Sequence, residues 1–234
     1  MKKPTPRARP AEDADGVFEL IAHEIRGPLT VISGYLEILG RPLDDASHAR
    51  ALAESRRAIG RIETLLDDLV TATCASDCFA PRELVSVSMA ALAAESVTAL
   101  RDTSAHRLEV DAACPGEVFG DGARLRQALD NLLGNAIAYT PEGGRIMVAV
   151  CCEGDAVLTT VEDEGPGIPE DQRERIFKRF KRLGDDDTVR PGTGLGLYIV
   201  RTIVEAHGGS VHAEAVGVGR GARFVIELPA APAT

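Results

Sequence analysis

The sequence has no run of about 18 apolar residues, the shortest stretch that spans a membrane as a helix. It also has no apolar signal core, because its basic start MKKPTPRARP leads into the acidic AEDADG. We therefore predict neither a membrane span nor an export signal, and we expect a cytoplasmic protein. The first 15 residues fit a disordered, basic, Pro-rich tail better than a nucleic-acid or lipid-binding arm.

The sequence has few cysteines, and they lack the spacing of a metal site. They are Cys74, Cys78, Cys114, Cys151 and Cys152, an odd number without a CxxC pair. Such a set favours reduced, mostly structural thiols over a zinc site. We therefore expect no structural zinc.

Basic residues are in the minority. The chain has 26 Lys and Arg residues and 36 Asp and Glu residues, which gives a formal net charge of −10. A nucleic-acid binder needs an excess or a strong cluster of Lys and Arg to neutralise phosphates, so this charge argues against that class. The 234 residues, 44% of them hydrophobic, are enough for one large or two modest domains.

Two long amphipathic helices are predicted in the first third of the chain. The first starts at residue 16, and GRPL at 40–43 ends it with a Gly and a Pro. The second covers about 44–73. Their heptad-spaced apolar residues are Phe18, Ile25, Ile32 and Leu39 in the first helix and Leu52, Ile59, Leu66, Ile62 and Leu69 in the second. The short connection predicts an antiparallel hairpin over 16–74. Alone, this hairpin would expose an apolar seam formed by these residues. A second copy of the chain would cover the seam, so we expect a homodimer with a four-helix bundle.

A composition change predicts a linker at 75–85 and a second domain at 86–230. Alternating apolar residues predict strands at 107–112, 145–152, 156–163, 210–216 and 222–229. Helical patterns cover about 87–102, 122–138 and 195–207. We expect an α+β chain whose second domain is a two-layer α/β sandwich, an antiparallel sheet with helices on one face.

The segment HEIRGPL places a titratable pair and a helix breaker in the first helix. In the heptad frame His23 points away from the seam, so its imidazole can act as a nucleophile, and the adjacent Glu24 can take a proton. Pro28 removes a backbone donor and loosens the helix around Glu24. From this segment alone, an ordinary solvated His-Glu pair is equally compatible.

Three polar residues share one face of the predicted helix at 122–138. Gln127, Asn131 and Asn135 recur every four residues. Their amide oxygens can bind magnesium and their amide nitrogens can bind phosphate oxygens. Considered alone, such residues more often cap a helix or make a hydrogen bond in the core.

Two glycine-rich segments suggest a nucleotide site. DEGPGIP follows a predicted strand, so Asp163 can accept the exocyclic amine of adenine while Gly165 and Gly167 permit close backbone approach. Alone, the segment also fits a tight turn. PGTGLGL opens a helix whose N–H groups suit a polyphosphate. It lacks the spacing of the dinucleotide fingerprint, and no GxxxxGK[ST] sequence occurs.

The segment RERIFKRFKRLGDDDTVR at 173–190 lies between these glycine-rich segments. Its basic residues are interleaved with Phe177 and Phe180, a pattern that also occurs in nucleic-acid binders. The acidic net charge and the short extent favour a mobile lid whose cations approach a triphosphate.

Taken in order, these segments resemble the sensor histidine kinase family over residues 17–229. HEIRGPL is similar to its H box, NLLGNA (131–136) to its N box, DEGPGIP to its first glycine box, RIFKRF (175–180) to its F box and GTGLGL to its second glycine box. The resemblance implies a dimerisation and phosphotransfer hairpin followed by an ATP-binding domain. It also implies a receiver domain of a response regulator as partner.

The resemblance implies a role for individual residues. His23 would be the phosphoacceptor and Glu24 the base, with Asn135 and Asn131 as Mg²⁺ ligands and Asp163 as the adenine reader. The remaining ATP-binding positions would be Tyr139, Gly165, Gly167, Lys181, Arg182, Gly194, Leu195 and Gly196.

Two positions depart from the family pattern. Ala138 stands where the family usually has Lys, so a phosphate contact is missing unless Lys181, Arg182 or Arg190 replaces it. Gly27 stands four residues after His23, where members with phosphatase activity commonly carry Thr or Asn, so we expect little dephosphorylation of a partner. The first departure leaves a catalytically weak or inactive nucleotide-sensing scaffold as an alternative. An ATPase of the chaperone, gyrase and mismatch-repair superfamily explains neither His23 nor the hairpin.

No sensor domain is recognisable before residue 17. We expect either a kinase that takes its signal from a partner or the catalytic core of a longer protein.

Overall fold

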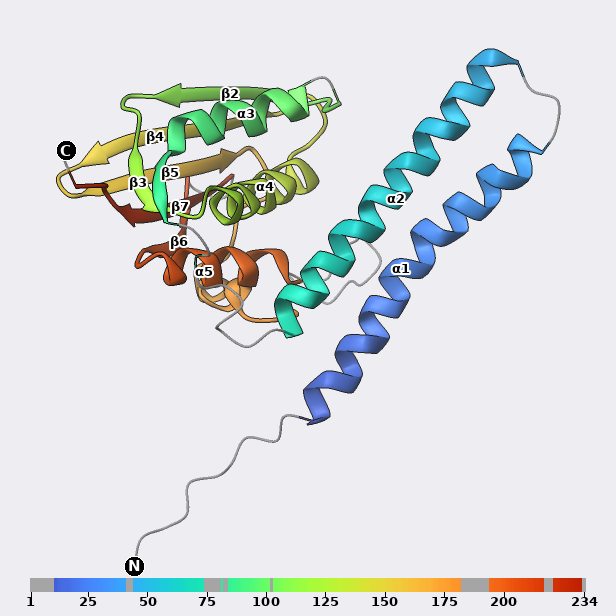
Figure 1. Cartoon of the computed structure of the whole chain (residues 1–234), viewed down its shortest axis with the longest axis horizontal. Coiled ribbons are helices and arrows are strands. Elements are labelled where there is room, and N and C mark those ends of the chain that lie inside the picture. Colours follow the sequence, from blue (N-terminus) through green and yellow to red (C-terminus); the bar gives the residue numbers. More distant parts are fainter. Residues whose placement is uncertain are drawn as a thin grey trace, which may run out of the picture. The chain divides into compact units, whose positions relative to one another are not determined.

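The computed structural model of the chain contains two compact units, one up to residue 70 and one from residue 71 onward (Figure 1). The described residues are 11–40, 44–73, 81, 84–101, 103–181, 194–216 and 221–232. Within the two N-terminal helices, the side chains of residues 11–21, 23, 24, 64 and 67–73 lie outside the description.

The first unit is a helical hairpin. Helices α1 (Ala11–Leu39) and α2 (Asp45–Thr73) lie side by side and run in opposite directions (Figure 1). Asp44 caps α2, because its Oδ1 accepts the N–H of Ser47 at 2.8 Å. The predicted hairpin is confirmed, but α1 begins five residues earlier than predicted. The segment AEDAD is helical because alanine favours helix and acidic residues suit the first turn.

The predicted seam residues of α2 lie on the outer side of the hairpin in a single chain. Among the α2 side chains that the structure describes, the buried ones are Ala51, Ser55, Ala58 and Leu65, which share one face. The predicted seam residues Leu52, Ile59 and Leu66 are 43%, 46% and 45% exposed. In α1, Leu29 and Leu36 are also exposed. Mostly small residues therefore fill the inner row of α2, and each helix has apolar side chains that a single chain leaves exposed to water.

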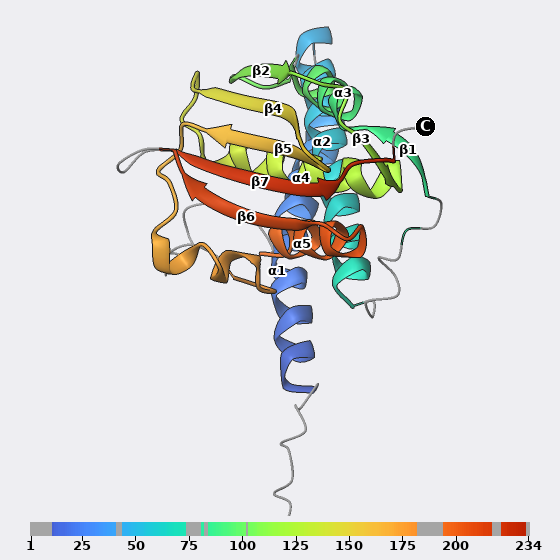
Figure 2. The same cartoon turned by 90° about the vertical axis from the view of Figure 1, so that its left-hand side faces the viewer.

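The second unit contains a five-stranded sheet with helices on one face. The strand order is β2 (Arg107–Ala112), β4 (Arg145–Glu153), β5 (Ala156–Asp163), β7 (Ala222–Pro229) and β6 (Ser210–Ala215). The covering helices are α3 (Met89–Arg101), α4 (Gly122–Tyr139) and α5 (Gly196–Ala206). Figure 2 shows these three helices behind the sheet. The core lies between the layers, and the two-layer α/β sandwich is confirmed.

The sheet is mixed, so the prediction of an antiparallel sheet was wrong in one pairing. Strands β2 and β4 are parallel, from the pair Arg107 and Arg145 to the pair Ala112 and Val150, whereas the other neighbours are antiparallel. The chain between β2 and β4 passes through α4, and such a crossover returns it to the end of the sheet where it started.

Several short elements were not predicted. Strands β1 (Val85–Ser88) and β3 (Glu117–Gly120) form a separate two-stranded antiparallel sheet. Two 3₁₀ turns, Glu170–Gln172 and Arg175–Phe177, follow β5. Each of these elements has three or four residues, too few to show a repeat in the sequence.

Helix α4 is fixed at its start by a side-chain cap and a histidine. The Oδ1 of Asp121 accepts the N–H groups of Ala123 and Arg124 at 3.1 and 3.2 Å. The Nε2 of His207, just after α5, accepts the N–H of Asp121 at 3.0 Å. The largest apolar residues of α4, including Leu129 and Leu132, are fully buried. This packing holds the polar face of α4 in place beside α5.

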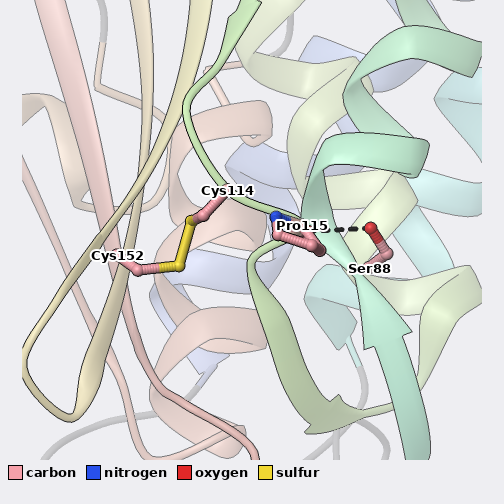
Figure 3. The surroundings of a disulfide bond; sticks show 4 residues. All are labelled: Ser88, Cys114, Pro115 and Cys152. Atoms are coloured by element: carbon pink, nitrogen blue, oxygen red, sulfur yellow. Dashed lines mark hydrogen bonds between the residues drawn. A yellow bond between two sulfur atoms is a disulfide. The ribbon is translucent and has the colours of Figure 1, made fainter.

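A disulfide joins Cys114 and Cys152, so the expectation of reduced thiols was wrong for this pair (Figure 3). Paired residues of β2 and β4 are 38 residues apart in the chain, as Arg107 and Arg145 are, and the two cysteines have the same separation of 38. The parallel register therefore carries them to opposite positions. Cys151 is a free thiol, whereas Cys74 and Cys78 lie outside the described residues.

None of the helices in the described part of the chain is long and apolar enough to cross a membrane.

Candidate nucleotide-binding site

Asp163 ends strand β5 with its carboxyl group buried on the helix side of the sheet. The residue is 5% exposed. Its Oδ1 accepts the N–H of Gly165 at 2.7 Å and the N–H of Ala222 at 3.3 Å. Burial raises the pKa of Asp163, and the two backbone donors partly oppose that rise. Both bonds fall on Oδ1, so neither of these backbone groups occupies Oδ2.

Glycines bring three segments of chain together around Asp163. A Cβ at Gly165 would lie 2.7 Å from Oδ1 of Asp163 and 3.0 Å from the carbonyl oxygen of Tyr139, so a larger residue does not fit. The carbonyl of Gly165 accepts the N–H of Gly221 at 2.8 Å. Gly167 has φ of +79°, which favours glycine. The end of β5, the end of α4 and the start of β7 therefore converge.

Asn131 lies against the first turn of α5. A Cβ at Gly196 would be 3.5 Å from Oδ1 of Asn131. The Nδ2 of Asn131 is buried and has no hydrogen-bond partner among the described residues. Leu195 occupies the N-cap position of α5, and its side chain makes no capping hydrogen bond. A buried amide donor beside the N-terminus of a helix is an arrangement that suits phosphate oxygens.

Two arginine–aromatic contacts hold the segment around 175–180 on α5. Nη2 of Arg179 donates to the hydroxyl of Tyr198 at 2.7 Å, and its guanidinium lies 4.6 Å from the centre of that ring. The guanidinium of Arg201 lies 4.6 Å from the centre of the Phe177 ring. Each contact pairs one residue of the segment with one residue of α5, so the contacts fix the segment against that helix.

The segment ends next to the start of α5. Phe180 has φ of +58°, and its N–H donates to the carbonyl of Gly194 at 3.0 Å. A Cβ at Gly194, whose φ is +68°, would be 2.9 Å from the backbone of Phe180. Sequence reasoning missed this contact and both arginine–aromatic pairs. The Arg and Phe residues of RIFKRF were visible in the sequence, but nothing there identified their partners on α5.

The structure brings together many of the predicted site residues. Tyr139, Asp163, Gly165 and Gly167 lie in one cluster, and Asn131, Leu195 and Gly196 lie in another, with Gly194 beside them. Asn135 is half-buried one turn after Asn131, and Lys181 is exposed. The third amide of the predicted face, Gln127, instead accepts from Arg124 at 3.0 Å. The side chains of His23 and Glu24, and residues 182–193, lie outside the described part.

Together, the two clusters fit adenosine triphosphate better than they fit a metal ion alone. Asp163 suits the amine of adenine, while Asn131 and the start of α5 suit phosphates. Within the described residues, no group of three or more His, Cys, Asp or Glu is placed to hold a metal ion. A magnesium ion here would use amide oxygens of Asn131 and Asn135 together with phosphate oxygens.

Two known families match separate parts of the chain. Residues 16–74 match the family described as His Kinase A (phospho-acceptor) domain. Residues 120–232 match the family described as Histidine kinase-, DNA gyrase B-, and HSP90-like ATPase.

Individual relatives are sensor kinases. The phosphate regulon sensor protein PhoR of Pseudomonas aeruginosa is 33% identical over 210 residues, which cover 87% of this chain and 47% of PhoR. The adaptive-response sensory kinase SasA of Synechococcus is 33% identical over 92% of this chain and 59% of its own. The chain therefore spans about half the length of these relatives.

Solved structures give the same result. A mycobacterial sensor histidine kinase, MprB, superimposes with a TM-score of 0.57 at 32% identity, over 64% of this chain and 99% of that structure. Histidine kinase ThkA, solved in complex with response regulator protein TrrA, gives a TM-score of 0.62 at 26% identity, over 91% of this chain and 60% of its own. The chain belongs to the sensor histidine kinase family.

Proposed function

We propose that this chain is a histidine kinase core, which transfers the γ-phosphoryl group of ATP to His23 and then to an aspartate of a response-regulator receiver domain. The observation that carries the proposal is the buried Nδ2 of Asn131 beside Gly196 at the start of α5, which has no hydrogen-bond partner within the described ranges of the chain. An uncompensated buried donor is costly, and a phosphate oxygen would satisfy it.

The nucleotide would bind across the two clusters of the second unit. Asp163 accepts the adenine amine, and the first N–H groups of α5 face the phosphates. Asn131 and Asn135 would supply amide oxygens for Mg²⁺, and the charge of that ion would neutralise the phosphates. The buried carboxylate selects adenine over guanine, because guanine presents a carbonyl oxygen where adenine presents an amine.

The phosphoryl step needs the imidazole of His23 as nucleophile. A nitrogen–phosphorus bond forms as the bond from the γ-phosphorus to its bridging oxygen breaks, and ADP leaves with that oxygen. Glu24 takes the proton from the other ring nitrogen, which keeps the imidazole nucleophilic. A receiver aspartate then attacks the phosphorus and releases neutral histidine, with a proton returned to the ring.

The partners follow from the hairpin and from the relatives. The exposed apolar side chains, among them Leu29, Leu36, Leu52 and Ile59, would be covered in a homodimeric four-helix bundle. ThkA was solved with a response regulator, and we assign this chain a partner of the same class. We place the protein in the cytoplasm, where ATP and receiver domains occur, without a nucleic-acid partner. Gly27 carries no side chain to orient a water, so the phosphatase reaction is expected to be weak.

Incubation with γ-labelled ATP and Mg²⁺ tests the proposal. The chain is expected to acquire label that is stable in base and lost in acid, as a phosphohistidine is, and to pass it to a purified receiver domain. Label in the α position should give no signal. If the chain binds ATP but acquires no label, it is a nucleotide-sensing scaffold and the proposal is wrong.

Replacement of Ala138 by Lys is expected to tighten ATP binding about tenfold. Ala138 is exposed near the end of α4, three residues after Asn135, and a charge-assisted bond to a phosphate contributes about 1.5–3 kcal/mol before screening by water. Calorimetric titration with a non-hydrolysable ATP analogue measures the change. Ala138→Met is the control for side-chain length without charge. Equal affinity in both variants would mean that position 138 does not face the phosphates.

A further inference from the structure

The disulfide between Cys114 and Cys152 links the connection between β2 and β3 to strand β4 in the second unit. Cys114 belongs to the connection from β2 to β3, and Cys152 lies near the end of β4 (Figure 3). The N–H of Ala113 donates to the carbonyl of Val150 at 2.9 Å, which continues the pairing of β2 with β4 up to the disulfide. The disulfide therefore fastens the connection to β4.

The residues after Cys114 hold the start of α3. The carbonyl of Pro115 accepts the hydroxyl of Ser88 at 2.8 Å and the N–H of Ala90 at 3.2 Å. The carbonyl of Gly116 accepts the N–H of Met89 at 3.0 Å. Figure 3 shows the Ser88 bond to Pro115 beside the disulfide. The position of the connection thus determines whether the first turn of α3 keeps its hydrogen bonds.

The same connection is closely packed on the sheet. A Cβ at Gly116 would lie 2.7 Å from Cγ1 of Val150 and 3.0 Å from Cγ1 of Val157. Gly116 also has φ of +62°, which side chains other than glycine rarely adopt. The connection has little room to shift while the disulfide holds it, so the disulfide and this packing act on the same short segment.

The disulfide is accessible to solvent. Cys152 is exposed and Cys114 is partly exposed, in contrast to the fully buried Val150 two positions earlier on β4. A thiolate in solution can therefore reach the sulfur of Cys152 without unfolding of the sheet. Disulfides of cytoplasmic proteins are usually transient or redox-sensing, and this step of the argument rests on the compartment given by the proposed function.

We propose that Cys114 and Cys152 form a reversible redox site, with dithiols as reductants and small disulfides as oxidants, that controls how firmly the start of α3 is held. A dithiol thiolate attacks Sγ of Cys152, and Cys114 leaves as a thiolate and takes a proton. The second thiol of the reductant then attacks the mixed disulfide, and Cys152 leaves and is protonated. Two electrons and two protons pass from the dithiol to the protein, and a disulfide oxidant reverses the exchange.

The chemical part of the proposal is tested by alkylation of the folded chain with N-ethylmaleimide and peptide mass spectrometry. Before reduction, Cys151 is expected to react while Cys114 and Cys152 do not. After treatment with dithiothreitol without denaturant, all three should react, and oxidised glutathione should restore the protection. Alkylation of Cys114 and Cys152 without reductant, or resistance of the disulfide in the folded chain, would overturn the proposal.

The structural part is tested by hydrogen exchange on the same samples. Reduction should speed exchange of the Met89 and Ala90 amides roughly tenfold, since their acceptors are Gly116 and Pro115, while Ile199 in α5 should be unchanged. Loss of the disulfide should also lower Tm by roughly 5–15 °C. Unchanged exchange at Met89 and Ala90 would contradict the proposed control of α3.

Two variants separate the disulfide from its neighbour. Cys152→Ser should show the exchange pattern of the reduced chain without any reductant. Cys151→Ser is the matched control, and it should keep the full response to dithiothreitol because Cys151 is outside the disulfide. These measurements do not depend on phosphoryl transfer, so a failure of the redox proposal and a failure of the kinase proposal are distinguishable.

Discussion

Replacement of His23 by Gln is expected to reduce labelling from γ-labelled ATP to background, a loss of at least roughly 10³-fold. Glutamine keeps much of the size of the imidazole and its capacity for hydrogen bonds, but its amide nitrogen is not a nucleophile at neutral pH. No other group in the proposed reaction can accept the phosphoryl group in its place. Filter assays or gel assays of acid-labile label measure the loss.

Nucleotide affinity provides the internal check for this variant. The proposed ATP site lies in the second unit and His23 lies in the first, so His23→Gln should bind an ATP analogue as tightly as the unchanged chain. His48→Gln is the matched control, because His48 is an exposed histidine in the first turn of α2. Full labelling of His23→Gln, or equal loss in His48→Gln, would show that His23 is not the acceptor.

Replacement of Asp163 by Asn is expected to weaken ATP binding roughly 100-fold. The asparagine Oδ1 can still accept the N–H groups of Gly165 and Ala222, so the local backbone is kept. Its amide nitrogen, however, presents a donor to the adenine amine, which is also a donor, and the bond to a charged acceptor is lost. Titration with ATP measures the change. Asp155→Asn, in the exposed turn after β4, is the matched control.

The same variant, which weakens ATP binding, is expected to raise the stability of the fold. The size of this increase depends on pH. Burial raises the pKa of Asp163 above its value in the unfolded chain, so the folded state holds this proton more tightly. That preference favours folding at pH below the unfolded pKa, about 4, and is lost as the pH rises through the folded pKa. At neutral pH the folded chain therefore bears the cost of a buried charge.

Asp163→Asn removes this cost, so the variant should melt at a higher temperature than the unchanged chain at about pH 7.5. The advantage should shrink as the pH is lowered toward about 4.5. Thermal melts across this range measure it. A variant that is less stable at every pH would mean that the carboxylate makes a stabilising contact beyond the two backbone bonds.

The secondary structure could largely be predicted because its patterns are local. The predicted strands at 107–112, 156–163 and 222–229 coincide with β2, β5 and β7, since alternation and flanking turn residues both mark them. The parallel pairing of β2 with β4 was not predictable in the same way, because it depends on how the α4 crossover packs. Without that pairing, the number of residues between Cys114 and Cys152 did not indicate that they form a disulfide.

The inner row of the hairpin was missed for a related reason. Heptad counting selects large apolar residues such as Leu52 and Ile59, whereas the buried row includes Ala51, Ser55 and Ala58. Small residues bury well only where two helices approach closely, and a single sequence does not state that distance. The predicted outward direction of His23 stays a prediction, since its side chain lies outside the described part.

The candidate site was predictable where special backbone geometry demands glycine. Gly165 and Gly167 are required by a close contact and a positive φ, and both could be found from DEGPGIP. The pairs of Arg179 with Tyr198 and Arg201 with Phe177 could not, because arginine is common on surfaces and its partner is set by tertiary packing.

The hydrogen bond between Phe180 and Gly194 also has a consequence for chain length. The contact holds the two ends of the segment between residues 180 and 194 next to one another. When the two ends of a chain segment are held together, doubling the length of the segment costs only about 0.6 kcal/mol of loop-closure entropy. Insertions and deletions between the two residues should therefore be tolerated, so homologous proteins can differ there in both length and composition while α5 keeps its position.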